Sequence, residues 1–311
     1  MSLYGRFIPK GPSGFGYSST AEEVSAGLDL RGKNYLITGS NSGIGRETAR
    51  VLSVRGATVL MAARSQAKAV EAGRNFAQSV IPLECDLSQP GSVRQCVEQV
   101  KQTGRLLDGI IANAGIMALP RWEQRYGCEL QFLTNHVGHF ILITGLLEQL
   151  GDKGRVTLVS SRAHHRTYAE GIQFDNLSGE KGYSPWQAYG QSKLANLLMA
   201  RSLAKRFANS GRLANAIHPG VIVTNLGRHL PGVGRQLLRW INPLFLKSIP
   251  AGAATQTWVT VHPDAAQHQG QYLADCNLGT TSAWGRDELL AERLWVESEK
   301  IVSALEQKAD A

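Results

Sequence analysis

The chain has 311 residues, of which 43% are hydrophobic and 19% charged, and its formal net charge at pH 7 is +8. This is an ordinary globular composition, in a chain long enough to bury a sizeable core as one large domain or two small ones. The lysines and arginines are dispersed without a basic run, so we expect a solvated basic surface and no nucleic-acid partner.

The cysteines are scattered, without Cys-x-x-Cys pairs or the spacing of a metal site. This pattern excludes a disulfide framework and a zinc site, and it favours reduced thiols in a cytoplasmic protein. The cysteines are Cys85, Cys96, Cys128 and Cys276.

Residues 1–30 are predicted to be an N-terminal extension that packs on the main domain. The segment is polar, rich in Gly, Ser and Pro, and lacks the apolar core of a secretory signal. Thr20 and Glu23 have the spacing of a capping box, which predicts a short helix there. No stretch of the chain reaches the ~18 apolar residues that span a bilayer, so no transmembrane segment is expected.

From residue 34 onward, short apolar strands alternate with helix-length amphipathic segments. Such alternation implies right-handed crossovers. We therefore predict an α/β fold, a single Rossmann-type doubly wound parallel sheet of about seven strands flanked by helices. No repeat or linker divides residues 31–311, which we interpret as one domain. The expected strands are 34–38, 58–63, 80–83, 109–112, 156–160, 213–217 and 270–273, and the main expected helices are 44–55, 130–150 and 187–207.

A glycine-rich turn, Thr-Gly-Ser-Asn-Ser-Gly-Ile-Gly, connects the first predicted strand to the first long helix. Such a turn lets the backbone approach a pyrophosphate, and the helix N-terminus supplies N–H groups and the positive end of its dipole. A tight turn without a ligand is the alternative. The residues expected to contact a dinucleotide here are Thr38, Gly39, Ser42, Gly43, Ile44 and Gly45.

The end of the second strand bears on the choice of cofactor. NAD sites place an acid there, whereas NADP sites place a cation. This chain has Ala63 where the acid is expected, and Arg64 follows it. We expect Arg64 to pair with a 2′-phosphate and NADP(H) to be preferred over NAD(H), although a surface arginine is the plainer interpretation.

Tyr189 and Lys193 lie four residues apart in a predicted helix, so their side chains share one face. An ammonium beside a phenol stabilises the phenolate and is expected to lower the tyrosine pKa from about 10 toward neutral. Such a phenol can exchange a proton with an alcohol. Together with a nicotinamide cofactor, this indicates reversible oxidation of an alcohol to a carbonyl.

These motifs occur in an order that resembles the short-chain dehydrogenase/reductase family, over residues from about 30 to about 300. The glycine turn is followed by Asn-Ala-Gly at 113–115, an asparagine in a helix, a Ser-Ser strand end, Tyr-x-x-x-Lys and Pro-Gly. Within the family the chain is similar to the retinol-dehydrogenase-like branch. The segments that carry this second resemblance are 134–140, 189–196 and 270–276.

The resemblance implies roles for four residues. Tyr189 would be the general acid/base, and Lys193 would lower its pKa and hold the nicotinamide ribose. Ser161 would bind the substrate oxygen, although Ser160 would do so if the strand register differed by one residue. Asn135 would distort its helix and hold a water in a proton relay to Lys193; a polar residue that merely bonds the helix backbone is the alternative.

The resemblance also implies the remaining cofactor contacts. Asp86 and Leu87 would flank the adenine, and the Asn-Ala-Gly segment would line the adenosine ribose. The Pro-Gly segment would cover the nicotinamide, with Thr224 near the phosphates. Ala112 departs from the family's usual asparagine, which puts one contact between strands in doubt. The residues expected at these contacts, with the catalytic pair, are Asn113, Ala114, Gly115, Tyr189, Lys193, Pro219, Gly220, Ile222 and Thr224.

Two segments, 162–185 and 225–248, are expected to build the substrate pocket. The second mixes leucines and aromatic residues with arginines, which fits a lid over a lipophilic carbonyl or alcohol such as a retinoid, steroid or aromatic compound. An amphipathic helix in peripheral membrane contact is the alternative. His164 and His165 in the first segment could contact substrate, although loop surface is the preferred interpretation, and no metal ligand set is expected.

Other functions remain as alternatives. The first is a catalytically silent NADP(H)-binding sensor or scaffold of the same fold. Nucleotide-sugar epimerisation is a second, disfavoured by the glycine spacing. The family's usual dimer surfaces correspond to the helices 130–150 and 187–207, so we expect a homodimer or tetramer, with the N-terminal extension covering part of that surface.

Overall fold

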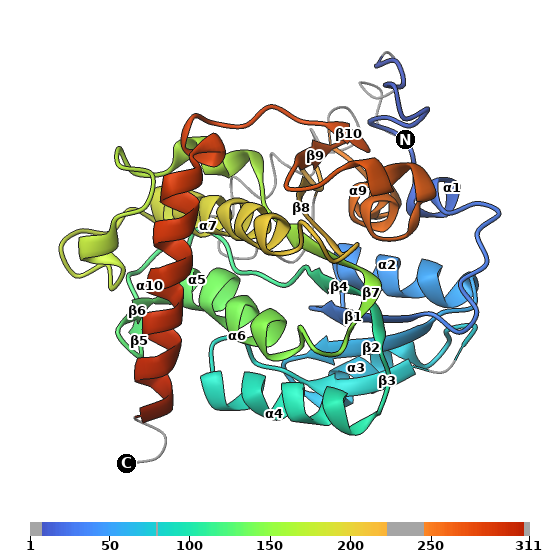
Figure 1. The fold of residues 1–311 in the computed structure, drawn as a ribbon, viewed down its shortest axis with the longest axis horizontal. Helices are drawn as coiled ribbons and strands as arrows, with labels where there is room; N and C mark the ends of the chain where they lie inside the picture. Colours follow the sequence, from blue (N-terminus) through green and yellow to red (C-terminus); the bar gives the residue numbers. More distant parts are fainter. Residues whose placement is uncertain (1–7, 79, 223–245, 308–311) are drawn as a thin grey trace.

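The computed structural model describes residues 8–78, 80–222 and 246–307. Within these residues, eight strands form one mostly parallel sheet in the order β10-β9-β8-β7-β4-β1-β2-β3 (Figure 1). A separate hairpin pairs β5 (Gln124–Arg125) with β6 (Cys128–Glu129). The sheet consists of β1 (Asn34–Thr38), β2 (Thr58–Ala63), β3 (Val80–Glu84), β4 (Leu107–Ala112), β7 (Leu150–Val159), β8 (Leu213–His218), β9 (Tyr272–Ala274) and β10 (Asn277–Leu278).

The strand order confirms the predicted doubly wound sheet. The chain runs outward from β1 to β3, returns to β4 on the other side of β1, and continues to β9. The order therefore reverses between β1 and β4, and the carboxyl ends of these strands form the crevice where ligands of such sheets bind. The eighth strand, β10, is antiparallel to β9 at the edge, and its two residues were too short a signal to predict.

The central strands are apolar on both faces because helices cover both sides of the sheet. One face packs on α4, α6 and α7, with α10 outside them, and the other packs on α2, α3 and α9 (Figure 1). The helices are α2 (Gly43–Val54), α3 (Gln66–Gly73), α4 (Pro90–Gln102), α6 (Gly138–Gly145), α7 (Pro185–Arg206), α9 (Ile249–Val261) and α10 (Glu288–Gln307).

The expectation of one helix over 130–150 is wrong. The segment forms α5 (Leu130–Phe132), a π-helix (Leu133–Val137) and α6, and β7 begins at Leu150. A turn closed by the Gln149 N–H on the Leu146 carbonyl ends the helix. The Gln149 carbonyl then accepts the Leu107 N–H at the start of β4. A continuous apolar run is compatible with both a helix and a strand. The boundary between α6 and β7 is therefore set by this pairing with β4.

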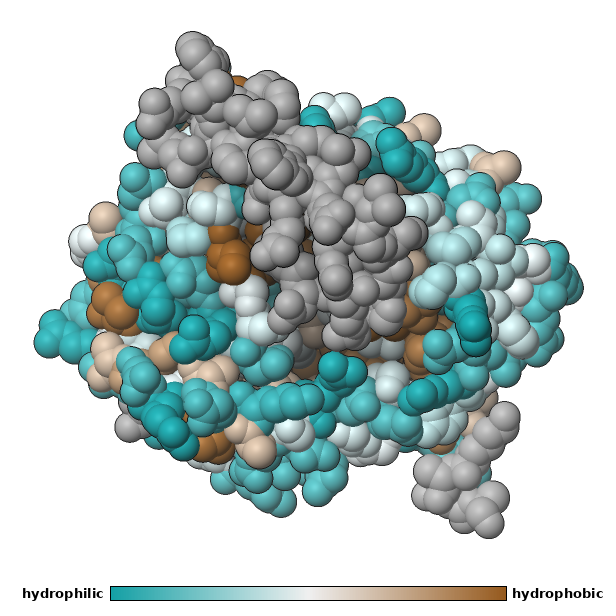
Figure 2. All heavy atoms as spheres, turned by 180° about the vertical axis from the view of Figure 1, so that it is seen from behind, coloured by the Kyte–Doolittle hydropathy of each residue, from teal (hydrophilic) through white to brown (hydrophobic). Residues whose placement is uncertain are grey.

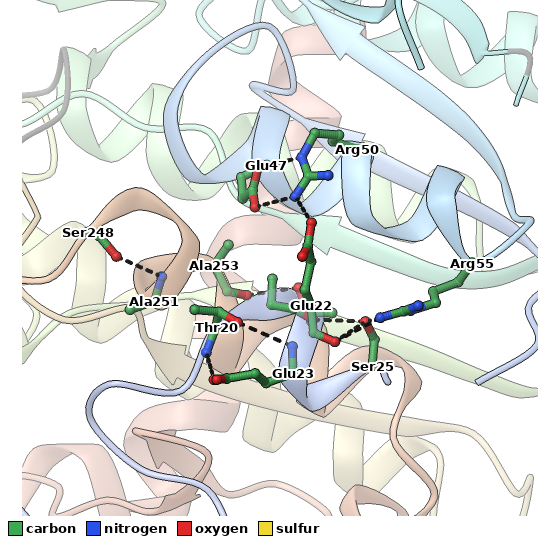
Figure 3. A network of polar contacts seen from close by, with 12 residues as sticks. Thr20, Glu22, Glu23, Ser25, Glu47, Arg50, Arg55, Ser248, Ala251 and Ala253 are labelled. Carbon is green, nitrogen blue, oxygen red and sulfur yellow. Dashed lines mark hydrogen bonds and ion pairs between the residues drawn. The ribbon is translucent and has the colours of Figure 1, made fainter. Parts of the chain in front are cut away.

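The N-terminal segment contains α1 (Ala21–Val24), and the predicted capping box is confirmed. The Thr20 N–H donates to Glu23 Oε2 at 2.8 Å, and the Glu23 N–H donates to Thr20 Oγ1 at 3.2 Å. Side chains then connect α1 to α2: Arg50 pairs with Glu22 and Glu47 (Figure 3). Ala21 is fully buried among residues of α2 and α9.

No described helix is long and apolar enough to cross a bilayer. On the face shown in Figure 2, the coloured side chains are mostly hydrophilic, and hydrophobic ones appear in small separate patches. All four cysteines are buried and free.

Candidate active site

Helix α7 places the tyrosine and the lysine one turn apart, as predicted. Pro185 occupies the first turn of the helix, where its missing N–H costs nothing. Tyr189 and Lys193 are 5% and 3% exposed, and the Lys193 Nζ lies 5.7 Å from the centroid of the Tyr189 ring. The ammonium donates to the Val159 carbonyl at 3.0 Å, which ties α7 to the end of β7.

The pKa of Tyr189 differs from the sequence-based expectation. Burial raises this pKa to about 12, and a hydrogen bond with Ser161 opposes only part of the rise. Burial also lowers the Lys193 pKa to about 8. The Lys193 ammonium donates to the Val159 carbonyl, and desolvation of the buried phenol is the largest effect on the Tyr189 pKa. Tyr189 is therefore protonated at neutral pH and can act as a proton donor.

The two serines at the end of β7 have different partners. The Ser160 hydroxyl is 1% exposed and donates to the Lys193 carbonyl at 2.6 Å. The Ser161 hydroxyl accepts the Ala163 N–H at 3.1 Å, capping a short 3-10 helix (Arg162–Arg166), and it lies near enough to the Tyr189 phenol to lower its pKa. The structure thus places Ser161, and not Ser160, beside the phenol.

Asn135 lies in the π-helix, and its side chain connects three segments. Its Nδ2 donates to the Ile116 carbonyl and to Ser192 Oγ, both at 2.9 Å, and its Oδ1 accepts the Ile116 N–H at 2.8 Å. A Cβ at Gly115 would lie 3.1 Å from Asn135 Oδ1 and 3.3 Å from Lys193 Nζ. The glycine therefore allows the loop after β4 to lie against both side chains.

His139, which the sequence analysis did not single out, completes this network. It is fully buried, and burial lowers its pKa to about 4. Its Nδ1 lies 2.8 Å from the Asn135 carbonyl, which can only accept, so Nδ1 carries the proton. Its Nε2 must then accept from Thr38 Oγ1, also at 2.8 Å. The sequence signal for this contact was the spacing: a histidine four residues after a helical asparagine lies on the same face of the helix.

The glycine-rich turn has the backbone that a dinucleotide needs. Gly39 and Gly43 have φ of 65° and 57°, in the left-handed region that favours glycine. A Cβ at Gly45 would collide with the Asn113 side chain and the Gly39 carbonyl. Ser42 is the N-cap of α2 without a side-chain capping bond, and the first turn of α2 carries no acid that would repel a phosphate.

The turn after β4 packs against the glycine-rich turn and forms the other side of the candidate dinucleotide site. Thr38 Oγ1 accepts the N–H groups of Asn113 and Ala114 at 2.9 and 3.0 Å. Asn113 Nδ2 donates to the Thr38 carbonyl at 2.8 Å, whereas Asn113 Oδ1 is buried without a partner. A buried acceptor with no donor beside this turn fits a ribose hydroxyl. The residues present are thus suited to a nicotinamide dinucleotide.

The ends of β2 and β3 carry the residues expected near the adenosine. Arg64 follows β2 directly, is exposed, and has no ion pair or hydrogen bond within the described part of the chain. Asp86 Oδ1 accepts from the N–H and hydroxyl of Ser88, both close to 3 Å. Leu87 is 4% exposed and packs against Gly138.

The Pro-Gly segment after β8 approaches Lys247, which belongs to the second segment expected to build the substrate pocket. Gly220 has φ of 94°, and a Cβ there would lie 2.6 Å from Lys247 Cδ. The Lys247 side chain is 1% exposed and pairs with Asp275 at 2.5 Å. Ile222 forms a parallel bridge with Lys247. Thr224 and most of the predicted lid 225–248 lie outside the described residues.

In the first predicted pocket segment, His164 is buried and therefore not loop surface. Its Nδ1 lies 2.6 Å from the Ser161 carbonyl, and its Nε2 accepts the Ser282 N–H. His165 is exposed. Among the described residues, no group of three or more His, Cys, Asp or Glu could hold a metal ion. Trp186 is 44% exposed and contacts Tyr189 edge-on, with ring centroids 6.3 Å apart.

Comparisons with known proteins agree with this geometry. Residues 33–231 match the model of the family described as short chain dehydrogenase. A chloroplastic short-chain dehydrogenase of Brassica napus, TIC 32 A, is 41% identical over 98% of this chain and 100% of its own length. Retinol dehydrogenase 14 of Mus musculus is 36% identical over 89% of this chain and 87% of its own length.

Solved structures are similar as well. A putative uncharacterized protein from Mycobacterium paratuberculosis superposes with a TM-score of 0.75 at 34% identity, over 92% of this chain and 98% of that one. A short chain dehydrogenase from Burkholderia cenocepacia, in complex with NADP, has a TM-score of 0.63 at 22% identity, over 79% and 96% of the two chains. The second likeness supports the fold alone.

Proposed function

Because the chain belongs to the short-chain dehydrogenase family, in its retinol-dehydrogenase-like branch, we propose that it is an NADP(H)-dependent oxidoreductase that interconverts a lipophilic alcohol and its carbonyl. One observation carries the reaction type. The Ser161 hydroxyl lies beside the Tyr189 phenol at the carboxyl end of β7, where it lowers the pKa of the phenol, and Lys193 follows one turn later on α7. A substrate oxygen beside both hydroxyls would receive two hydrogen bonds.

Each of these residues has a distinct part in carbonyl reduction. The bound nicotinamide would supply the hydride for the carbonyl carbon. Tyr189 donates its proton to the carbonyl oxygen, and its raised pKa keeps that proton available at neutral pH. Ser161 holds the same oxygen. Lys193 would hold the nicotinamide ribose, and Asn135 keeps the loop after β4 in place beside Lys193.

The preference for NADP(H) rests on charge. Arg64 at the end of β2 is exposed and without an ionic partner in the described residues, and no acid occupies position 63. A guanidinium binds a 2′-phosphate with charge-assisted hydrogen bonds, whereas it has no equally strong contact to a ribose hydroxyl.

A lipophilic substrate is supported by Trp186. Its large apolar ring is 44% exposed although it contacts the buried Tyr189. An exposed aromatic ring beside a catalytic group can cover an apolar part of the substrate.

The test is the replacement Tyr189→Phe. The phenyl ring keeps the packing but lacks the proton, so carbonyl reduction should fall by about 100-fold or more while NADPH binding is retained. Carbonyl reduction is measured as loss of NADPH absorbance with a panel of lipophilic aldehydes and ketones. NADPH binding is measured by fluorescence titration.

Tyr126→Phe is the matched control, because Tyr126 is 47% exposed in the β5–β6 hairpin, and it should behave as the wild type. Comparable turnover in Tyr189→Phe would refute the assignment. A wild-type protein that binds NADPH but reduces none of these carbonyls would instead be a sensor or scaffold.

A further inference from the structure

A cavity of about 370 Å³ lies between the N-terminal segment and the carboxyl end of β9. The N-terminal wall includes Pro9, Gly11 and Tyr17, and the opposite wall includes Arg162 and Tyr272. Arg162 begins the first segment expected to build the substrate pocket, whereas the N-terminal wall was expected only to pack on the domain.

The cavity adjoins the proposed active site through the sheet. His218, which precedes the Pro-Gly segment, pairs in register with Ala274 of the cavity wall. The Ser160 N–H donates to the Ile217 carbonyl, so the ends of β7, β8 and β9 lie side by side. Arg162 directly follows Ser161. A substrate whose carbonyl lies at Ser161 could therefore extend into this cavity.

Among the described residues that line the cavity, Arg162 carries a positive charge without an ionic partner. Arg162 is exposed and has no ion pair or hydrogen bond to any described residue. Asp275 also lines the cavity, but its carboxylate pairs with the buried Lys247. His218 nearby stays neutral because burial lowers its pKa to about 4, and the Arg162 charge acts in the same direction.

A second observation is independent of this charge. Tyr272 is 2% exposed, yet its hydroxyl has no hydrogen-bond partner in the described part of the chain. A buried hydroxyl left without a partner costs free energy, and most such groups in folded proteins are satisfied. A ligand oxygen that reached this shielded hydroxyl from the cavity would accept its hydrogen bond.

We propose that the cavity holds the carboxylate of an amphipathic substrate, bound by Arg162 and Tyr272, while the substrate's carbonyl lies at Ser161 and Tyr189. This inference rests on the proposed function and narrows the substrate from a lipophilic carbonyl to one with an anionic end.

The experiment compares a medium-chain ω-oxo fatty acid with its methyl ester, which has the same chain and aldehyde but no charge. The wild type should reduce the acid with the higher kcat/KM. Arg162→Gln should lower the acid-to-ester ratio of kcat/KM about tenfold, as for a lost charge-assisted hydrogen bond. Tyr272→Phe should lower the ratio by a smaller factor without loss of stability, because its hydroxyl has no hydrogen-bond partner among the described residues.

Arg166→Gln is the matched control: it is an exposed arginine at the other end of the same 3-10 helix, outside the cavity wall, and the ratio should stay unchanged. A wild-type ratio near one, or a ratio insensitive to Arg162→Gln, would overturn the inference and leave the proposed function standing.

If neither aldehyde is reduced, calorimetric titration with the matching saturated fatty acid separates the two ideas. Binding that Arg162→Gln weakens would support the carboxylate site even though the proposed reaction had failed. No binding would overturn the site as well.

Discussion

Individual side chains in the candidate active site show how desolvation competes with neighbouring charge. Tyr189 and Lys193 are both buried. Burial raises the pKa of the phenol and lowers the pKa of the ammonium, so it favours the neutral form of each group. The phenol is thereby ready to donate a proton, which suits carbonyl reduction at neutral pH. Alcohol oxidation requires the phenolate, so it should be favoured at higher pH.

Arg64 is the residue that should separate the two cofactors. Replacing it with Gln removes the charge but keeps a polar side chain at the end of β2. We expect NADPH affinity to fall about tenfold, because a charge-assisted contact to the phosphate is lost. NADH affinity, measured in the same fluorescence titration, serves as the internal control and should stay the same. Equal weakening of both cofactors would show that Arg64 does not contact the 2′-phosphate.

Two buried histidines should make the fold sensitive to acid. Burial lowers the pKa of His136 to about 3 and that of His139 to about 4. An unfolded chain takes up these protons near pH 6.5, whereas the folded chain does so only below about pH 4. Stability should therefore decrease as the pH falls from 6.5 toward 4, by on the order of 2 kcal/mol for each histidine at pH 5.

Urea unfolding at pH 7 and pH 5 measures this loss. His136→Asn should reduce the difference between the two pH values, whatever its effect on stability at pH 7. An unchanged difference would mean that other groups cause the acid sensitivity.

At the scale of elements, α1 depends on its cap because it is only one turn long. Thr20→Ala removes the acceptor for the Glu23 N–H and should lower the free energy of unfolding by about 1 kcal/mol. Glu22→Gln breaks the Glu22–Arg50 pair, which is half-exposed and should contribute under about 0.5 kcal/mol. Urea unfolding of both variants measures the two losses of stability, and the loss should be larger for Thr20→Ala. Equal losses would contradict this prediction.

The π-helix around Asn135 is an element that local propensity does not predict. Within the helix, His139 Nδ1 contacts the Asn135 carbonyl four residues earlier, and a tertiary contact joins His136 Nε2 to Ser298 Oγ of α10 at 2.8 Å. The family resemblance predicted a distortion of the helix at Asn135. The length of the distorted segment depends on contacts with residues far away in the sequence.

At the scale of the whole molecule, α10 bears on the expected assembly. It lies across the outer side of α6 and α7 (Figure 1), where the Phe140 and Trp295 rings are 4.8 Å apart and Ser202 Oγ donates to the Ala291 carbonyl. These helices correspond to the surfaces expected to form a dimer. With α10 in place, we expect a monomer, and light scattering should give a mass close to 33.7 kDa. Twice that mass would show that another surface associates.

The sequence by itself determined the order of strands and helices, the glycine-rich turn and the spacing of Tyr189 and Lys193. These are local properties, set by hydrophobic periodicity, by φ angles that favour glycine and by the helical repeat. The resemblance to the family then supplied the roles of Ser161 and Asn135.

Only the tertiary structure decided which groups meet. The bond from His139 to Thr38, the ion pair of the buried Lys247 with Asp275, and the cavity lined by Arg162 and Tyr272 each connect segments distant in the sequence. The direction of the Tyr189 pKa shift was decided in the same way, because desolvation depends on everything packed around the phenol and not on its neighbours along the helix.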